Sequence, residues 1–169
     1  MKFIFATLLF TLISIASHAQ FSEAYVKITA PIGSPIAKNT VTNFKKLKFV
    51  KNVQFDLDNN VCKIYFVANE KPEMDELVKA VTQAGASVGY LKAVFNFNNP
   101  TLSAENCFTY QNDTYQISNF DKNKKLNGEL TVTFIGAGFM PKADWTKMAK
   151  TVGKECQTKT GKSYMLTIQ

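Results

Sequence analysis

The chain has 169 residues, 46% of them hydrophobic, and a formal net charge of +7 at pH 7. All of its positive charge is lysine, because the sequence has no arginine, and this excludes the bidentate guanidinium contacts with which many proteins read nucleic acids. The single histidine, His18, lies in the N-terminal segment described next, so a mature chain without that segment has no imidazole to act as general base or metal ligand.

The first nineteen residues have the pattern of a secretory signal peptide. Lys2 supplies a positive start, residues 3–15 are almost entirely apolar, and Ser17-His18-Ala19 puts small residues at the −3 and −1 positions. The apolar run is shorter than the roughly 20 residues that a membrane span requires. We expect cleavage near Ala19 and a secreted or periplasmic protein without a transmembrane span. An uncleaved N-terminal anchor is the alternative.

Residues 22–98 show strand and helix patterns in the order β-α-β-β-α-β. Period-two alternation marks the strands, and apolar stripes at helical spacing mark the helices. Ser34 is a candidate N-cap with Pro35 at the first helical position, and Leu57 is expected on the inner face of its strand. This order predicts an α+β fold, a ferredoxin-like βαββαβ sandwich. The expected strands are 25–29, 50–57, 61–68 and 88–97, and the expected helices are 35–47 and 73–84.

Residues 98–103 have the composition of a linker, and residues 104–169 are expected to form a smaller C-terminal region. We assign it the order ββαβ, either packed on the first domain or forming a second, incomplete one. Residues 123–128 are polar and are expected to be a loop tip. The strand-like pieces are 108–110 and 114–117, followed by a strand at 130–135, a helix from Pro141 and a last strand at 164–168.

Aromatic residues gather near the junction of the two regions. We expect them to form a packed interface between the halves. If the halves stand apart instead, the same rings would form a partner-binding patch. The residues are Phe95, Phe97, Phe108, Tyr110, Tyr115 and Phe120.

Three cysteines follow the predicted signal peptide. Strand alternation in residues 61–67 puts Cys62 with Ile64 and Phe66 on the more apolar face, which predicts a buried free thiol. In an oxidising compartment we expect the other two, Cys107 and Cys156, to form a disulfide. The alternative is that these two are metal ligands, although their spacing is unlike CxxC.

Residues 24–97 resemble a heavy-metal-associated (HMA) domain. The resemblance lies in Phe44-Lys45-Lys46-Leu47, in the strand 50–57 and in the second helix from Glu76 through Ala86. In that family the loop before the first helix carries G-M-x-C-x-x-C, whose two thiolates bind Cu(I) or a similar soft ion. Here Gly33 and Ile36 stand where the family has its cysteines. The resemblance therefore implies a scaffold, and no binding residue is carried over.

The sequence predicts an exported, non-enzymatic binding or interaction protein that needs no cofactor. Its expected target is an unknown protein partner or an anionic surface, and not a nucleic acid. The alternative is a soft-metal protein that binds copper or a similar ion through sulfur ligands outside the loop. Catalysis is disfavoured because the acidic residues fall at turns and helix starts, where capping explains them. The sulfur candidates are Cys62, Cys107, Cys156, Met140, Met148 and Met165, and the acids are Asp56, Asp58, Glu70, Glu73, Asp75 and Glu76.

Overall fold

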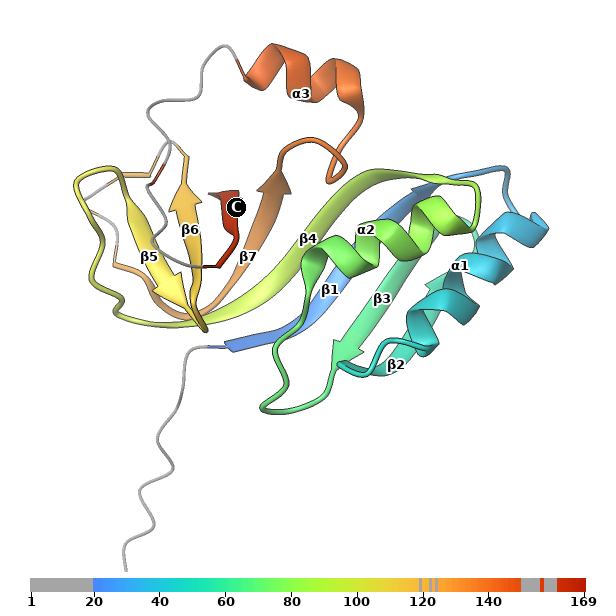
Figure 1. Ribbon diagram of the computed structural model, residues 1–169, viewed down its shortest axis with the longest axis horizontal. Helices are drawn as coiled ribbons and strands as arrows, with labels where there is room; N and C mark the ends of the chain where they lie inside the picture. Colours follow the sequence, from blue (N-terminus) through green and yellow to red (C-terminus); the bar gives the residue numbers. More distant parts are fainter. Residues whose placement is uncertain (1–19, 119, 122, 124, 150–155, 157–160) are drawn as a thin grey trace, which may run out of the picture.

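The computed structural model describes residues 20–118, 120–121, 123, 125–149, 156 and 161–169 (Figure 1). The predicted signal peptide, residues 1–19, lies outside the described residues. The helices are α1 (Pro35–Lys45), α2 (Met74–Gln83) and α3 (Lys142–Met148). The strands are β1 (Gln20–Thr29), β2 (Val50–Asp56), β3 (Val61–Phe66), β4 (Ser87–Asn98), β5 (Cys107–Tyr110), β6 (Asp113–Ile117), β7 (Asn127–Ile135) and β8 (Ser163–Ile168).

The chain is a mixed α+β protein in which one eight-stranded sheet runs through both halves. The strand order is β2-β3-β1-β4-β7-β8-β6-β5. All neighbouring strands are antiparallel except β6 and β8, which are parallel. The long strand β4 pairs with β1 on one side and with β7 on the other. The second half therefore continues the sheet of the first half.

The first half forms because each helix buries one stripe of side chains against the sheet. Figure 1 shows α1 and α2 on the same face of that sheet. At the start of α1, the Ser34 hydroxyl accepts a hydrogen bond from the Ala37 N–H at 3.4 Å, and Pro35 occupies the first turn. Thr40 and Phe44 lie on the buried face of this helix. Capping and amphipathic spacing together place α1 where the sequence predicted a helix.

The expected inner-face position of Leu57 is wrong, since this side chain is 53% exposed. Strand β2 ends at Asp56, and the Asp56 carboxylate accepts a hydrogen bond from the Asn59 N–H at 3.1 Å. This capped turn, in which Asn60 has a positive φ of 49°, ends the alternation one residue before Leu57.

The second half contains three strands before its helix, so the order is βββαβ and the assignment ββαβ is wrong. Gln111 and Asn112 have φ angles of 45° and 70°. Two consecutive residues with positive φ make a tight hairpin turn, and this turn separates β5 from β6. Strand β7 then follows as a third strand, paired with β4 rather than with the hairpin.

The sheet of the second half rolls up around an aromatic core. Three strands separate β4 from β5 in the sheet, yet the Phe108 ring of β5 lies 5.6 Å from the Phe95 ring and 5.5 Å from the Phe97 ring of β4. The Tyr110 ring also lies 5.1 Å from Phe95. The edge strand has therefore curled back over the sheet, and the expected packed interface is confirmed.

A disulfide joins Cys107 at the start of β5 to Cys156, with 6.3 Å between the Cα atoms. The predicted pairing is confirmed, and Cys62 is a free, buried cysteine as expected. None of the helices in the described residues is long and apolar enough to cross a membrane.

Candidate functional site

The loop that the HMA resemblance aligns with a metal site is a capped helix start in this chain. Gly33 has a φ of 69°, and the Ser34 N–H donates to the Pro31 carbonyl at 3.1 Å. Ile36 is half-buried in the first turn of α1, and Ile32 is 68% exposed. The loop thus presents backbone and aliphatic carbon where the family presents thiolates.

The sulfur candidates lie on separate elements of the fold. Met140 lies in the turn before α3, Met148 in α3 itself and Met165 in β8. The structure brings Cys107 and Cys156 together, as a disulfide. Within the described residues, no group of three or more His, Cys, Asp or Glu side chains is placed to hold a metal ion.

Cys62 lies in β3 between Val26 of β1 and Phe55 of β2. Its side chain is fully buried in the first-half core, and burial raises the pKa of the thiol to about 12. A buried thiol with a raised pKa is a poor nucleophile and a poor metal ligand. Cys62 therefore acts as a core residue.

We expect Cys62 to make stability fall with rising alkaline pH. Because its pKa rises from 9.0 in the ordinary case to about 12 in the fold, the unfolded thiol ionises first. The contribution of the protonated Cys62 thiol to the free energy of unfolding is complete below about pH 9. It is lost as the pH rises toward 12. Urea titrations across this range should give a shallower fall in the free energy of unfolding for Cys62→Ala than for the wild type. Equal slopes, or rapid reaction of the native thiol with a thiol reagent at neutral pH, would contradict this.

A cluster of charged side chains joins the start of α2 to the starts of β6 and β8. Its centre is the Asp113 carboxylate, which is only 3% exposed. One oxygen pairs with the Lys71 amine at 2.7 Å, and the other accepts a hydrogen bond from the Lys162 backbone N–H at 3.0 Å. A side chain at position 161 would come within 2.0 Å of the Asn112 carbonyl oxygen, so glycine there lets the two strands approach.

Two acidic residues at the start of α2 belong to this cluster. The Lys162 amine lies 2.8 Å from both the Glu73 and the Asp75 carboxylates, and the Tyr164 hydroxyl donates to Asp75 at 3.0 Å. Glu73 precedes α2 but makes no side-chain capping bond. Burial and the nearby Asp75 charge raise the pKa of Tyr164. The capping interpretation is wrong for Glu73, whereas Asp75 does lie in the first turn of α2 as expected. Both acids also belong to the cluster, which joins the two halves.

Asp113→Ala is expected to lower the free energy of unfolding by about 2 kcal/mol, because it removes the Lys71 ion pair and leaves the Lys162 N–H without its acceptor. Asp113→Asn, which retains an acceptor oxygen, should cost less. Asp58→Ala, in an exposed hairpin, is the matched control and should change stability by less than about 0.5 kcal/mol. Equal losses for Asp113→Ala and Asp58→Ala in urea denaturation would show that the cluster adds nothing.

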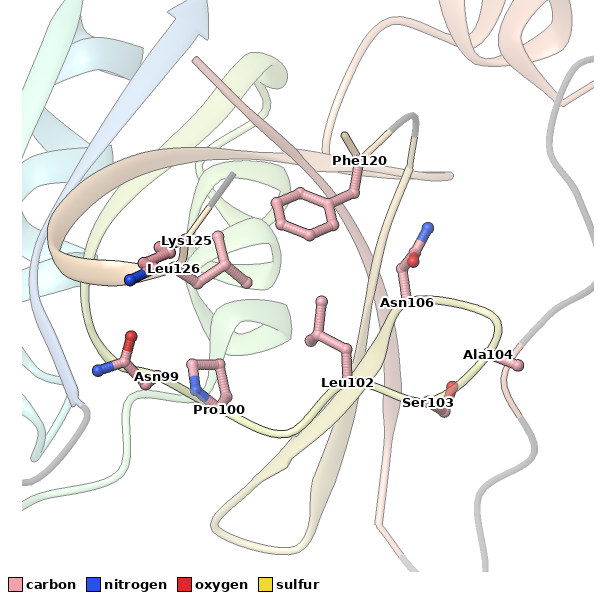
Figure 2. Close-up of a pocket in the computed structure, with 9 residues that line it drawn as sticks. All are labelled: Asn99, Pro100, Leu102, Ser103, Ala104, Asn106, Phe120, Lys125 and Leu126. Carbon is pink, nitrogen blue, oxygen red and sulfur yellow. The ribbon is translucent and has the colours of Figure 1, made fainter. Parts of the chain in front are cut away.

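A concave feature lies where the β4–β5 connection meets the β6–β7 connection. We call it the junction cavity; its volume is about 490 Å³. Figure 2 shows Leu102, Phe120 and Leu126 pointing toward a common space. The lining residues are Asn99, Pro100, Leu102, Ser103, Ala104, Asn106, Phe120, Lys125 and Leu126.

A second hollow of about 330 Å³ adjoins the junction cavity. The two share Phe120, Lys125 and Leu126 as a common wall. The far side of the second hollow is formed by the ends of β6 and β8 and by β7. Its remaining lining residues are Ile117, Ser118, Asp121, Leu130, Ile168 and Gln169.

Backbone hydrogen bonds hold the walls of the junction cavity in place. The Asn99 N–H donates to the Leu126 carbonyl at 2.9 Å, which ties the two connections together. The Ser103 N–H donates to the Cys107 carbonyl at 2.9 Å, and the Ile117 N–H donates to the Asn106 carbonyl at 3.0 Å. The disulfide begins at that same Cys107. The cavity is therefore largely preformed, as binding sites usually are.

The polar side chains of this cavity are few. The Ser103 hydroxyl is already paired with Glu105 and with the Cys107 N–H, which leaves Asn106 and Lys125 among the side chains that could meet a ligand. The Asn106 side-chain oxygen is buried and has no hydrogen-bond partner among the described residues, which is costly unless a ligand or water supplies a donor. Lys125 is the one charged side chain among the described lining residues, and it forms no ion pair in the described part of the chain. The apolar wall beside the Lys125 amine suits an amphipathic molecule that carries negative charge, whereas the Asn106 oxygen needs a donor such as water.

The sequence interpretation missed these residues, because it assigned residues 98–103 to a linker and 123–128 to a loop tip. The available signal was a single leucine in each of these polar stretches, Leu102 and Leu126. A lone apolar residue in a polar connection indicates that the connection packs against something. Phe120 was included among the junction aromatics, and the structure places it in the cavity wall instead of the ring cluster.

No family model, curated protein or solved structure matches this chain. The chemistry of the cavity is therefore the basis for assigning a function.

Proposed function

We propose that the chain is an exported, non-enzymatic binding protein that holds a small amphipathic anion in the junction cavity. The observation that carries this proposal is the amine of Lys125, which forms no ion pair with any described residue, beside an apolar wall that includes Leu102 and Phe120. The volume of about 490 Å³ falls within the usual range for small-molecule sites, roughly 300–1,000 Å³.

Export is supported by the disulfide, because such bonds persist in oxidising compartments, and by the signal-like pattern of residues 1–19. We place the protein in a secreted or periplasmic location on these grounds. No catalytic role is part of the proposal, since the cavity offers an amine, amide groups and apolar carbon, which are binding chemistry.

We also propose that the first half is a ferredoxin-like domain on an HMA-like scaffold. The strand order β2-β3-β1-β4, with two helices on one face, supports this assignment. The loop at Gly33 and Ile36 then serves as a helix start, and the ligand site has moved to the second half. A copper-binding role draws no support from the cysteines, since Cys62 is buried and the other two form the disulfide.

Calorimetric titration with octanoate and with its neutral amide, octanamide, tests the proposal. Lys125→Gln is expected to weaken octanoate binding about tenfold, because it removes one charge-assisted hydrogen bond. Octanamide binding should stay unchanged. Lys147→Gln removes the same charge from exposed α3 and should alter neither ligand. Octanoate affinities that are equal in wild type and Lys125→Gln, or no octanoate binding by the wild type, would refute the proposal.

A further inference from the structure

A concentrated patch of positive charge lies far from the junction cavity, where α1 ends and β2 begins (Figure 1). Lys45, Lys46, Lys48 and Lys51 fall within seven residues, and all four are exposed. In the described part of the chain none of them forms an ion pair. We call these four residues the lysine corner.

The local structure holds the lysine corner outward. Phe44 and Phe49 are buried in the first-half core and fix the segment at two points. Residues 47–50 make a tight turn, in which the Val50 N–H donates to the Leu47 carbonyl at 3.0 Å. Because the apolar residues of this segment face inward, its lysines are left on the surface. The backbone that carries the four amines is therefore preorganised.

The charge of the corner exceeds what the fold requires. Lysines in the last turn of a helix complement its dipole, which accounts for Lys45 and Lys46 but not for Lys48 and Lys51. The loop after β3 lies beside the corner, since the Val67 N–H donates to the Phe49 carbonyl at 2.9 Å. That loop carries two carboxylates, Glu70 and Glu73, and Glu73 is already paired with Lys71 and Lys162.

A small polar hollow opens beside Lys46, between the last turns of α1 and α2. Its volume is about 270 Å³. The Asn43 amide donates to the Ala80 carbonyl at 3.2 Å, which fixes one wall. The hollow is lined by Asn39, Thr42, Asn43, Lys46, Gln83 and Ala84. The Thr42 hydroxyl already donates to the Lys38 carbonyl at 3.1 Å. The Lys46 amine lies 3.4 Å from the Asn43 side-chain oxygen. The remaining protons of the Lys46 amine, with the amides of Asn39 and Gln83, are the donors that suit a single anionic headgroup.

We propose that the lysine corner docks the protein on a bilayer with anionic headgroups, and that the hollow at Lys46 receives one of them. Lysine amines near such a surface are attracted without specific geometry. A nucleic acid is disfavoured because the chain has no arginine. In addition, Phe44 and Phe49, which lie beside the corner lysines in the sequence, are buried and offer no ring for base stacking. This inference goes beyond the ligand in the junction cavity and does not depend on it.

Vesicle co-sedimentation at low salt tests this inference, with phosphatidylcholine vesicles that contain or lack phosphatidylglycerol. Changing all four corner lysines to glutamine should weaken partitioning onto the anionic vesicles by about a hundredfold or more. The control changes four other lysines to glutamine, namely Lys79, Lys92, Lys142 and Lys147. The control has the same net charge as the corner variant, and its partitioning onto the anionic vesicles should weaken far less. Circular dichroism checks that both variants fold.

Three results would overturn the inference. The first is equal weakening in the corner variant and the control, which would make net charge alone responsible. The second is wild-type binding that does not differ between anionic and neutral vesicles. The third is a DNA oligonucleotide that binds the wild type more tightly than the anionic vesicles do and loses affinity with the same four lysines.

Discussion

The double variant C107S/C156S is expected to unfold with a free energy about 4 kcal/mol lower than that of the wild type. The disulfide closes a separation of 49 residues, and a cross-link of this length removes much conformational freedom from the unfolded chain. It also anchors the edge strand β5 at Cys107, whose neighbours form a wall of the junction cavity. Urea denaturation without reductant measures the difference.

Reduction of the wild type provides the matched control for this variant. Reductant should lower the stability of the wild type to that of C107S/C156S and should leave the variant unchanged. A loss of less than about 1 kcal/mol in the variant would mean that the bond contributes little to the fold.

Phe95→Ala is expected to cost about 3–5 kcal/mol, the usual range for removing a buried ring. The Phe95 side chain is 1% exposed, and its ring lies 4.6 Å from the ring of Phe21 and 4.6 Å from that of Phe97. With Tyr110 at 5.1 Å, it joins strands β1, β4 and β5. Loss of the ring leaves a cavity where the rolled sheet closes.

Tyr90→Ala is the comparison for Phe95→Ala, because Tyr90 lies on the same strand and is only half-buried. Its expected cost is about 1 kcal/mol. Thermal and urea unfolding of both variants will separate the two effects. If both variants lose the same stability, Phe95 does not hold the sheet closed.

The elements of the first half could be predicted because their signals are local. The alternation in residues 25–29 and the cap at Ser34 depend on residues a few positions apart. Alternation in residues 61–67 likewise placed Cys62 in the core. The end of the strand 50–57 could not be predicted in the same way. The Asp56 carboxylate caps the turn and ends the strand there, although the apolar alternation continues to Leu57.

The topology of the second half could not be predicted, because it depends on pairing between distant segments. Nothing in the pattern of β6 specifies a parallel partner that begins at Ser163, or that β7 pairs with β4. The junction aromatics indicated that the halves pack together. The rolling of the sheet follows from the contact between β4 and β5, which no periodicity encodes.

The candidate site was only partly visible in the sequence. The disulfide followed from compartment and from the burial of the third cysteine. The junction cavity did not, because its walls are irregular connections whose shape depends on long-range bonds such as that between Asn99 and Leu126. The ion pairs of Glu73 and Asp75 were missed for the same reason, since their partner Lys162 lies nearly ninety residues away.

The most direct test of the central claim is an amide chemical-shift titration of the ¹⁵N-labelled protein with octanoate. If the junction cavity is the binding site, the largest shifts will fall in residues 99–106 and 125–130, with small shifts in the loop at Gly33. Lys125→Gln should need more octanoate to reach the same shifts. Shifts concentrated at residues 30–36, or spread evenly over the surface, would contradict the assignment of the junction cavity as the binding site.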